Sequence, residues 1–149
     1  MTFALNSMRE NLHYQRERLE ETYRSFHDFA DQLSSTWWTV AAAAEKRLSK
    51  EEVPELLRND KSGRHLQRLQ IITTIHLPKL APFVDRLIKL RDEASELVAP
   101  VLLFGEASDE TAERLHGVEV RLGSLREDFD AAVRREARKL RGLRAWWRV

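Results

Sequence analysis

The stretch LNSMRENLHYQRERLEETYRSFHDFADQLSSTWWTV, residues 5–40, decides the fold of this chain. Apolar residues recur in it at seven-residue intervals, as Leu5, Leu12, Leu19, Phe26, Leu33 and Val40. A second apolar series lies three or four residues further on, as Met8, Tyr23, Phe29, Ala30, Trp37 and Ala44. Because the spacing continues without Pro or Gly, it predicts one long amphipathic helix with a heptad seam. We expect Asn6 or Ser7 to cap its start and Leu48 to end it, after roughly 65 Å.

A helix of this length does not fit inside a compact globule of 149 residues, whose radius of gyration is about 15 Å. Either the helix breaks, or the protein is elongated, or the helix packs on a partner. The candidate break is Ser34-Ser35-Thr36, three poor helix formers in a row. A kink there would let Trp37 and Trp38 fold back onto the core.

Shorter helices are predicted after this first one. Ser49-Lys-Glu-Glu52 has the capping-box pattern and indicates a short helix over about residues 50–58, although Pro54 could equally begin it. The polar cluster at residues 59–63 is typical of a turn, and a further helix over residues 64–76 ends before Pro78.

A fourth helix is expected from Pro82 to Phe104, kinked at Pro100 and capped by Gly105. Ser108 or Asp109 should cap the last one. The apolar stripe of that last helix consists of Leu115, Val118, Leu122, Leu125, Phe129, Val133, Ala137, Leu140 and Trp147. Its glycines, Gly117, Gly123 and Gly142, suggest close helix contact or a mobile tail.

These patterns predict an all-α fold: an elongated helical bundle with long first and last helices and coiled-coil-like packing. Residues 1–149 are expected to form a single helical domain, 42% hydrophobic and 33% charged. The chain has no Cys, no signal-peptide pattern in MTFALNSMRENLHYQ and no apolar run near the roughly 20 residues that span a bilayer. We therefore expect a soluble, cytoplasmic protein without a membrane span.

Two Glu-x-x-His patterns raise the hypothesis of a di-iron site, Glu10-Asn-Leu-His13 and Glu113-Arg-Leu-His116. Each His directly follows a core Leu and therefore points to the flank of its seam. The two patterns could meet only if their helices ran parallel. We predict no metal and no cofactor, with both His residues at the rim or in solvent.

Arg58-Asn59, followed by His65, resembles the Arg-x(4–6)-His motif of HEPN ribonucleases, which are small all-α proteins. The resemblance implies in-line attack of a ribose hydroxyl, with His as general acid or base and Arg stabilising the phosphate. A polar turn between two helices is the alternative explanation of these residues. No Gly-rich phosphate loop, nucleophile elbow or Ser/His/Asp spacing accompanies the motif, so we expect no enzyme.

The C-terminal segment 134–149 carries seven Arg or Lys against one Glu, whereas residues 1–133 carry 18 basic and 23 acidic side chains. Arg with Trp suits single-stranded nucleic acid, an anionic membrane surface, or the acidic remainder of the protein or of a partner. The candidate nucleic-acid-binding residues are Arg134, Arg135, Arg138, Lys139, Arg141, Arg144, Trp146 and Arg148.

The sequence favours a non-enzymatic assembly subunit that docks on a protein partner, or on a second copy of itself, through the first helix. The expected anchors are Leu12, Leu19, Phe26, Leu33 and Trp37. The alternative is a small RNA- or single-strand-binding subunit of a ribonucleoprotein complex that uses the Arg/Trp helix. A HEPN-like ribonuclease is the third hypothesis.

Overall fold

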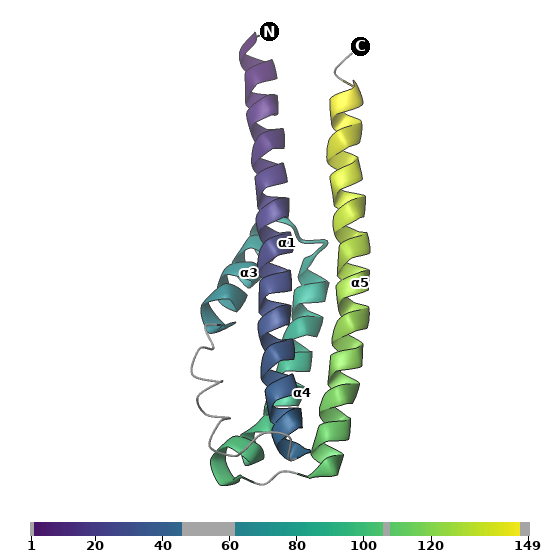
Figure 1. Cartoon of the computed structure of the whole chain (residues 1–149). Helices are drawn as coiled ribbons and strands as arrows, with labels where there is room; N and C mark the ends of the chain where they lie inside the picture. The colour runs from purple at the N-terminus through teal and green to yellow at the C-terminus, as the bar shows by residue number, and fades with distance from the viewer. Residues whose placement is uncertain (1, 46–61, 106–107, 147–149) are drawn as a thin grey trace.

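The computed structural model describes residues 2–45, 62–105 and 108–146, with side chains over residues 3–45, 65–105 and 108–142. These residues form helices α1 (Thr2–Ala44), α3 (Ser62–His76), α4 (Ala81–Phe104) and α5 (Asp109–Trp146). Together they make an elongated all-α bundle whose long first and last helices lie side by side (Figure 1). The predicted fold class is confirmed. The short helix predicted over residues 50–58 lies outside the described residues.

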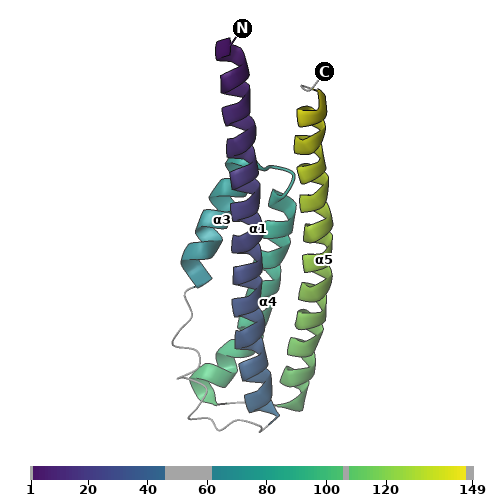
Figure 2. The ribbon, with the colours of Figure 1, turned by 45° about the horizontal axis from the view of Figure 1, so that its top comes forward.

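The two long helices run antiparallel, so the N- and C-terminal ends of the chain lie at the same end of the bundle (Figures 1 and 2). Helix α3 packs on α1 and on α4, and α4 packs on both α1 and α5. The turn between α3 and α4 lies partway along the long helices. Beyond this turn α1 and α5 continue without α3 or α4 beside them, and we call this part the open end of the bundle.

Helix α1 is continuous through residues 34–36, the candidate break that the sequence left open. The hydroxyl of Ser34 donates a hydrogen bond to the Glu119 carboxylate of α5 at 2.8 Å, which removes it from competition for the helix backbone. Trp37 is 3% exposed and packs in the core, so tertiary packing outweighs the weak local helix propensity. Trp38, in contrast, is 54% exposed and does not fold back onto the core.

Helix ends follow the local signals in the sequence. Pro82 lies in the first turn of α4, where a backbone N–H would have no acceptor within the helix, so no helix hydrogen bond is lost. Gly105 ends α4 in the left-handed conformation, at a φ of 65°, and its N–H donates to the Val101 carbonyl at 3.1 Å. At the start of α5 the Ser108 hydroxyl accepts a hydrogen bond from the Thr111 N–H at 3.2 Å. These three predictions are confirmed.

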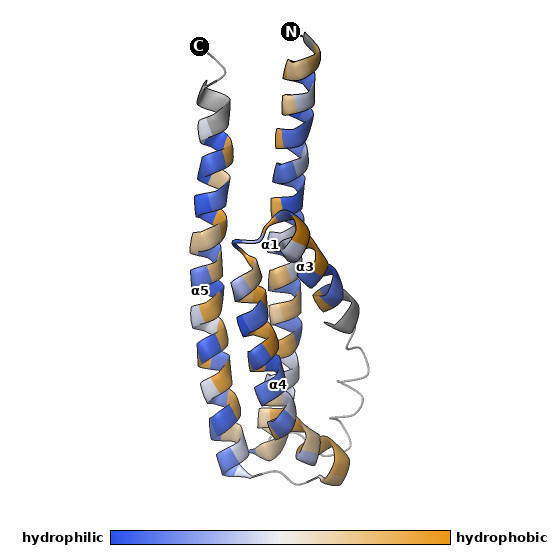
Figure 3. Ribbon diagram, turned by 180° about the vertical axis from the view of Figure 1, so that it is seen from behind, coloured by the Kyte–Doolittle hydropathy of each residue, from blue (hydrophilic) through white to orange (hydrophobic). Residues whose placement is uncertain are grey.

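Other helix boundaries differ from the prediction. Helix α1 begins at Thr2, so Asn6 and Ser7 lie inside it rather than at its cap. Helix α4 contains Pro100 as predicted, and its last turns run at an angle to the rest of the helix (Figures 1 and 2). Exposed apolar side chains gather on these last turns, where Figure 3 shows a strongly hydrophobic segment.

One hydrophobic core connects all four helices, and its centre is aromatic. The rings of Phe26 in α1 and Phe129 in α5 are fully buried and stack with centroids 3.7 Å apart and planes 12° apart. Phe83 of α4 adds an edge contact to Phe129 at 6.1 Å. These rings hold α1, α4 and α5 together at one level of the bundle.

An ion pair on the surface reinforces the α4–α5 packing. Arg121 donates two hydrogen bonds to the Glu93 carboxylate, at 2.8 and 2.5 Å. This hydrogen bonding, with the positive charge of the guanidinium, lowers the pKa of Glu93 below its ordinary value.

Neither Gly117 nor Gly123 of α5 contacts a neighbouring helix, because an added Cβ would meet no atom within 4 Å. Of the two explanations that the sequence offered for the glycines, close helix contact is therefore wrong for these two.

Candidate functional site

The heptad seam of α1 divides into a buried part and an exposed part. Leu19, Phe26, Leu33 and Trp37 are buried in the chain's own core, whereas Leu12 is only half-buried. Packing within the chain therefore explains the heptad pattern at these four anchors without a partner. The transition between the two parts lies between Leu12 and Leu19.

The exposed part of the seam belongs to the open end of the bundle. Leu5 and Met8 are 44% and 48% exposed, although they continue the apolar series of α1. Helices α3 and α4 do not extend to this level, so α5 is the only described helix that runs beside this part of α1 (Figure 1). An apolar surface that the fold leaves uncovered is a candidate for docking.

Polar pairs join α1 to α5 along most of their contact. His27 Nε2 lies 2.7 Å from Asp130 Oδ1, and Arg126 donates to Asp31 at 2.6 Å. Further along, the Ser34 hydroxyl donates to Glu119 at 2.8 Å, and His116 Nε2 lies 3.2 Å from Glu45. In each pair one group carries negative charge and the other is a donor, so the two helices attract each other along this line. Among the described side chains, His27 and Asp130 form the last such pair toward the open end.

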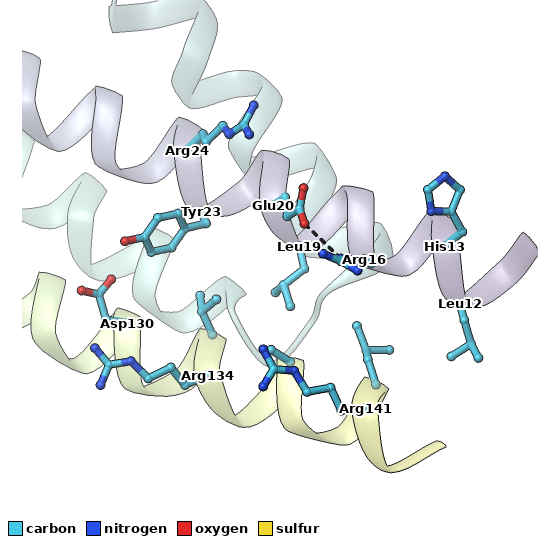
Figure 4. A pocket seen from close by; sticks show the side chains of 13 residues that line it. Leu12, His13, Arg16, Leu19, Glu20, Tyr23, Arg24, Asp130, Arg134 and Arg141 are labelled. Carbon is cyan, nitrogen blue, oxygen red and sulfur yellow. Dashed lines mark hydrogen bonds and ion pairs between the residues drawn. The ribbon is translucent and has the colours of Figure 1, made fainter. Parts of the chain in front are cut away.

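A cleft of about 610 Å³ opens between α1 and α5 beyond this last pair (Figure 4). Its floor is apolar and consists of Leu12 and Leu19 from α1 with Val133, Ala137 and Leu140 from α5. The polar residues that line it are His13, Arg16, Glu20, Tyr23, Arg24, Asp130, Arg134 and Arg141. A volume of this size on an apolar floor with a few charged groups is typical of a binding site.

Local sequence explains why the helices leave this space. The second apolar series of α1 is interrupted after Met8, and the polar residue Arg16 lines the cleft in this gap. On α5, Ala137 offers only a methyl group between the larger Val133 and Leu140. Two long helices with polar and small residues at facing levels cannot fill the groove between them.

The cleft carries an excess of positive charge. Four arginines line it against two carboxylates. Glu20 is already paired with Arg16 at 3.1 Å, and Asp130 with His27, so both carboxylates have partners within the chain. Arg24, Arg134 and Arg141 form no ion pair with another residue in the part of the chain whose side chains are described. The cleft therefore presents guanidinium groups around an apolar floor, a combination that suits an amphipathic, anionic ligand.

The nucleic-acid-binding residues predicted from the sequence do not all lie at the same site in the structure. Arg134 and Arg141 line the cleft, whereas Arg135, Arg138 and Lys139 are exposed on α5 outside it. Lys139 pairs with Glu136 at 2.9 Å, and the nearby ammonium group of Lys139 lowers the pKa of Lys79. The candidate side chains of Arg144, Trp146 and Arg148, and the stripe residue Trp147, lie outside the described side chains.

The remaining motifs do not converge on a site. His65 is exposed on α3, and its motif partner Arg58 lies outside the described residues, so the HEPN-like spacing stays a prediction. The two Glu-x-x-His patterns lie near opposite ends of the bundle, because α1 and α5 are antiparallel. Within residues 2–45, 62–105 and 108–146, no group of three or more His, Asp or Glu side chains could hold a metal ion. None of the described helices has the length and apolar character that a bilayer span requires.

Sequence reasoning missed the cleft as a site. It placed Ala137 in the apolar stripe of the last helix and Arg134 and Arg141 among the candidate nucleic-acid-binding residues, but it did not single out Arg16, Arg24 or Asp130. The signal that could have found the cleft was the gap in the apolar series at Gln15 and Arg16.

In comparisons with known proteins, the chain matches no family model, no curated sequence and no solved structure.

Proposed function

We propose that the protein is a non-enzymatic assembly subunit that binds a partner protein in the cleft at the open end of the bundle. One observation carries this proposal: α1 and α5 extend beyond α3 and α4 and enclose an apolar floor that nothing else in the described chain covers. Burying such a floor is worth about 25 cal/mol for each Å² of apolar surface removed from water. Covering this floor would therefore favour the binding of a partner.

This assignment revises the docking surface that the heptad pattern indicated. The anchors Leu19, Phe26, Leu33 and Trp37 stabilise the fold of the chain itself, and only Leu19 also reaches the cleft. Leu12 remains the heptad anchor with accessible apolar surface beside this site. Docking therefore depends on the open end of α1 together with α5, rather than on the full length of α1.

The test fills the cleft without changing the rest of the surface. Ala137→Trp places an indole on the cleft floor, and Ala131→Trp introduces the same side chain at an exposed position of the same helix outside the cleft. Wild type and both variants are used to purify binding proteins from the native host, and each candidate partner is then purified and its Kd measured by calorimetry.

We expect Ala137→Trp to weaken the binding of the purified partner at least about tenfold, because the indole occupies the space that the partner needs. Ala131→Trp should bind like wild type. Equal affinity for the two variants, with unchanged helix content by circular dichroism, would show that the partner does not use the cleft.

A single-strand-binding subunit of a ribonucleoprotein complex is the second candidate. The observation that favours it is the row of exposed cations Arg135, Arg138 and Lys139 on α5, outside the cleft. Fluorescence anisotropy with a labelled single-stranded RNA tests it at several salt concentrations. Binding that falls steeply with salt, is lost in Arg135→Glu/Arg138→Glu and persists in Ala137→Trp would support this function. An RNA affinity that the double charge reversal leaves unchanged would contradict it.

A further inference from the structure

Two arginines of α5 lie at either end of the cleft floor. Arg134 and Arg141 are seven residues apart, and neither forms an ion pair with another described residue. Seven residues correspond to about 10 Å along a helix axis, so the two guanidinium groups arise from the same side of α5, two turns apart. Between them the floor presents Ala137 and Leu140, and Val133 lies at the level of Arg134. The cleft thus alternates positive, apolar and positive along its length.

The first helix repeats part of this pattern from the other side. Arg24 lines the cleft at the level nearer to Asp130, and it too lacks an ion pair within the described residues. Arg16 lines the cleft toward the open end, but Glu20 holds it at 3.1 Å (Figure 4). Unsatisfied positive charge is therefore available at both levels, from Arg24 and Arg134 at one and from Arg141 at the other.

We propose that the occupant of the cleft is an amphipathic α-helix of a partner protein with two acidic side chains seven residues apart. Residues i and i+7 of a helix lie on one face about 10 Å apart, which matches the spacing of Arg134 and Arg141. Apolar residues at i+3 and i+4 would then lie between the two carboxylates and meet the apolar floor. This inference rests on the proposed function and specifies the chemistry of the partner.

Other occupants fit the charge pattern less well. A fatty acid or another amphiphile with one anionic group supplies a carboxylate to one level only and leaves the cations at the other level unpaired. A second copy of the chain would bring its own arginine-lined cleft toward this one, and like charges repel. A nucleic-acid strand matches the guanidinium groups but provides no aliphatic surface for Leu12, Leu19 and Leu140.

Two synthetic helices of about 20 residues test the proposal directly. The acidic peptide carries Glu at two positions seven apart, with Leu three and four residues after each. Its basic twin carries Lys at those two positions and is otherwise identical. Binding of each peptide to the full chain is measured by calorimetry at low and high salt, and the site is mapped by methyl NMR shifts of Leu12, Val133 and Leu140.

We expect the acidic peptide to bind about tenfold tighter than the basic twin at low salt, with the difference shrinking as salt screens the charges. Arg134→Glu/Arg141→Glu should reverse the preference, so that the variant binds the basic twin better. Arg135→Glu/Arg138→Glu changes the net charge of the same helix equally but outside the cleft, and it should keep the wild-type preference. Circular dichroism of each variant confirms that the bundle is intact.

Three results would overturn the inference: neither peptide binds, both bind equally at low salt, or the methyl shifts map outside the cleft. A further result would contradict the inference and leave the proposed function standing. In that result, Ala137→Trp abolishes the binding of a partner, but this partner contacts the cleft with a neutral or basic segment. If Ala137→Trp leaves partner binding unchanged, the proposed function falls on its own test. A reversal of peptide preference by Arg134→Glu/Arg141→Glu would be expected only for an acidic helix in this cleft.

Discussion

The aromatic stack between the two long helices gives the sharpest prediction about the fold. Phe26 and Phe129 are both 0% exposed, and their rings lie nearly parallel with centroids 3.7 Å apart. We expect Phe26→Ala or Phe129→Ala to lower the free energy of unfolding by about 3–5 kcal/mol each, since both the buried ring and its contacts are lost. The two changes should not be additive, because each ring forms part of the other's surroundings.

The assay is urea denaturation followed by circular dichroism at 222 nm, with the free energy of unfolding obtained by linear extrapolation. Phe104→Ala is the matched control, because it removes the same side chain from a position that is 72% exposed, and it should change stability by less than about 0.5 kcal/mol. A total stability of about 5–15 kcal/mol leaves little margin for a double alanine variant. The double-mutant cycle therefore uses Phe→Leu at both positions, and the coupling should be about 0.5–1.5 kcal/mol.

The cycle also tests the register of α1 against α5. A slip of seven residues along α5 would bring the level of Leu122 or Glu136 opposite Phe26 and separate the two rings. The reasoning is refuted if Phe26→Ala costs no more than Phe104→Ala, or if the Leu cycle shows no coupling between positions 26 and 129. Unchanged m-values across the series would show that the variants unfold from equally compact native states.

Three further predictions concern other parts of the bundle. The hydroxyl of Thr22 is buried without a hydrogen-bond partner among the described residues, whereas that of Thr73 donates to a helix carbonyl at 2.8 Å. We therefore expect Thr22→Val to raise the free energy of unfolding by about 1 kcal/mol and Thr73→Val to lower it. Equal effects of the two substitutions in urea melts would contradict this contrast. Gly123→Ala should raise stability by up to about 1 kcal/mol, because the added methyl meets no atom within 4 Å and removes the helix cost of glycine, and a lower Tm in the variant would show a contact at this position. Since Arg121 lowers the folded-state pKa of Glu93, this pair should stabilise the fold at neutral pH and lose its effect as the pH falls through that depressed pKa. Glu93→Gln should therefore lower the free energy of unfolding at pH 7 but not under strongly acidic conditions. A loss of equal size across the acid range would rule this out.

Most of the secondary structure was predictable because its signals are local. The heptad series of α1, Pro82 at the start of α4, Gly105 at its end and the Ser108 cap each act within a few residues of the chain. Whether α1 breaks at residues 34–36 could not be predicted, for the opposite reason. The polar side chains there are occupied across the bundle, as the bond from Ser34 to Glu119 shows, and local propensity carries no information about such a partner.

Only some of the residues that form the candidate site were predictable, and not their arrangement. Basic residues on the last helix were recognised, and Arg134 and Arg141 line the cleft. Their assignment to one site with Leu12 and Arg24 depends on how far α5 reaches back along α1, and the spacing of apolar residues within either helix does not specify that. The glycines of α5 show the same limit, because the contact they suggested depends on which side of the helix faces a neighbour.

The spacing of apolar residues is enough to predict a helical protein, its long first and last helices, and the apolar stripe of each. It does not predict that the two helices run antiparallel, with Phe26 opposite Phe129 and an unfilled cleft beyond His27 and Asp130. Helix periodicity arises from contacts three or four residues apart, which the sequence displays directly. Register and cleft arise from contacts about a hundred residues apart, which depend on the packing of every other helix in the bundle.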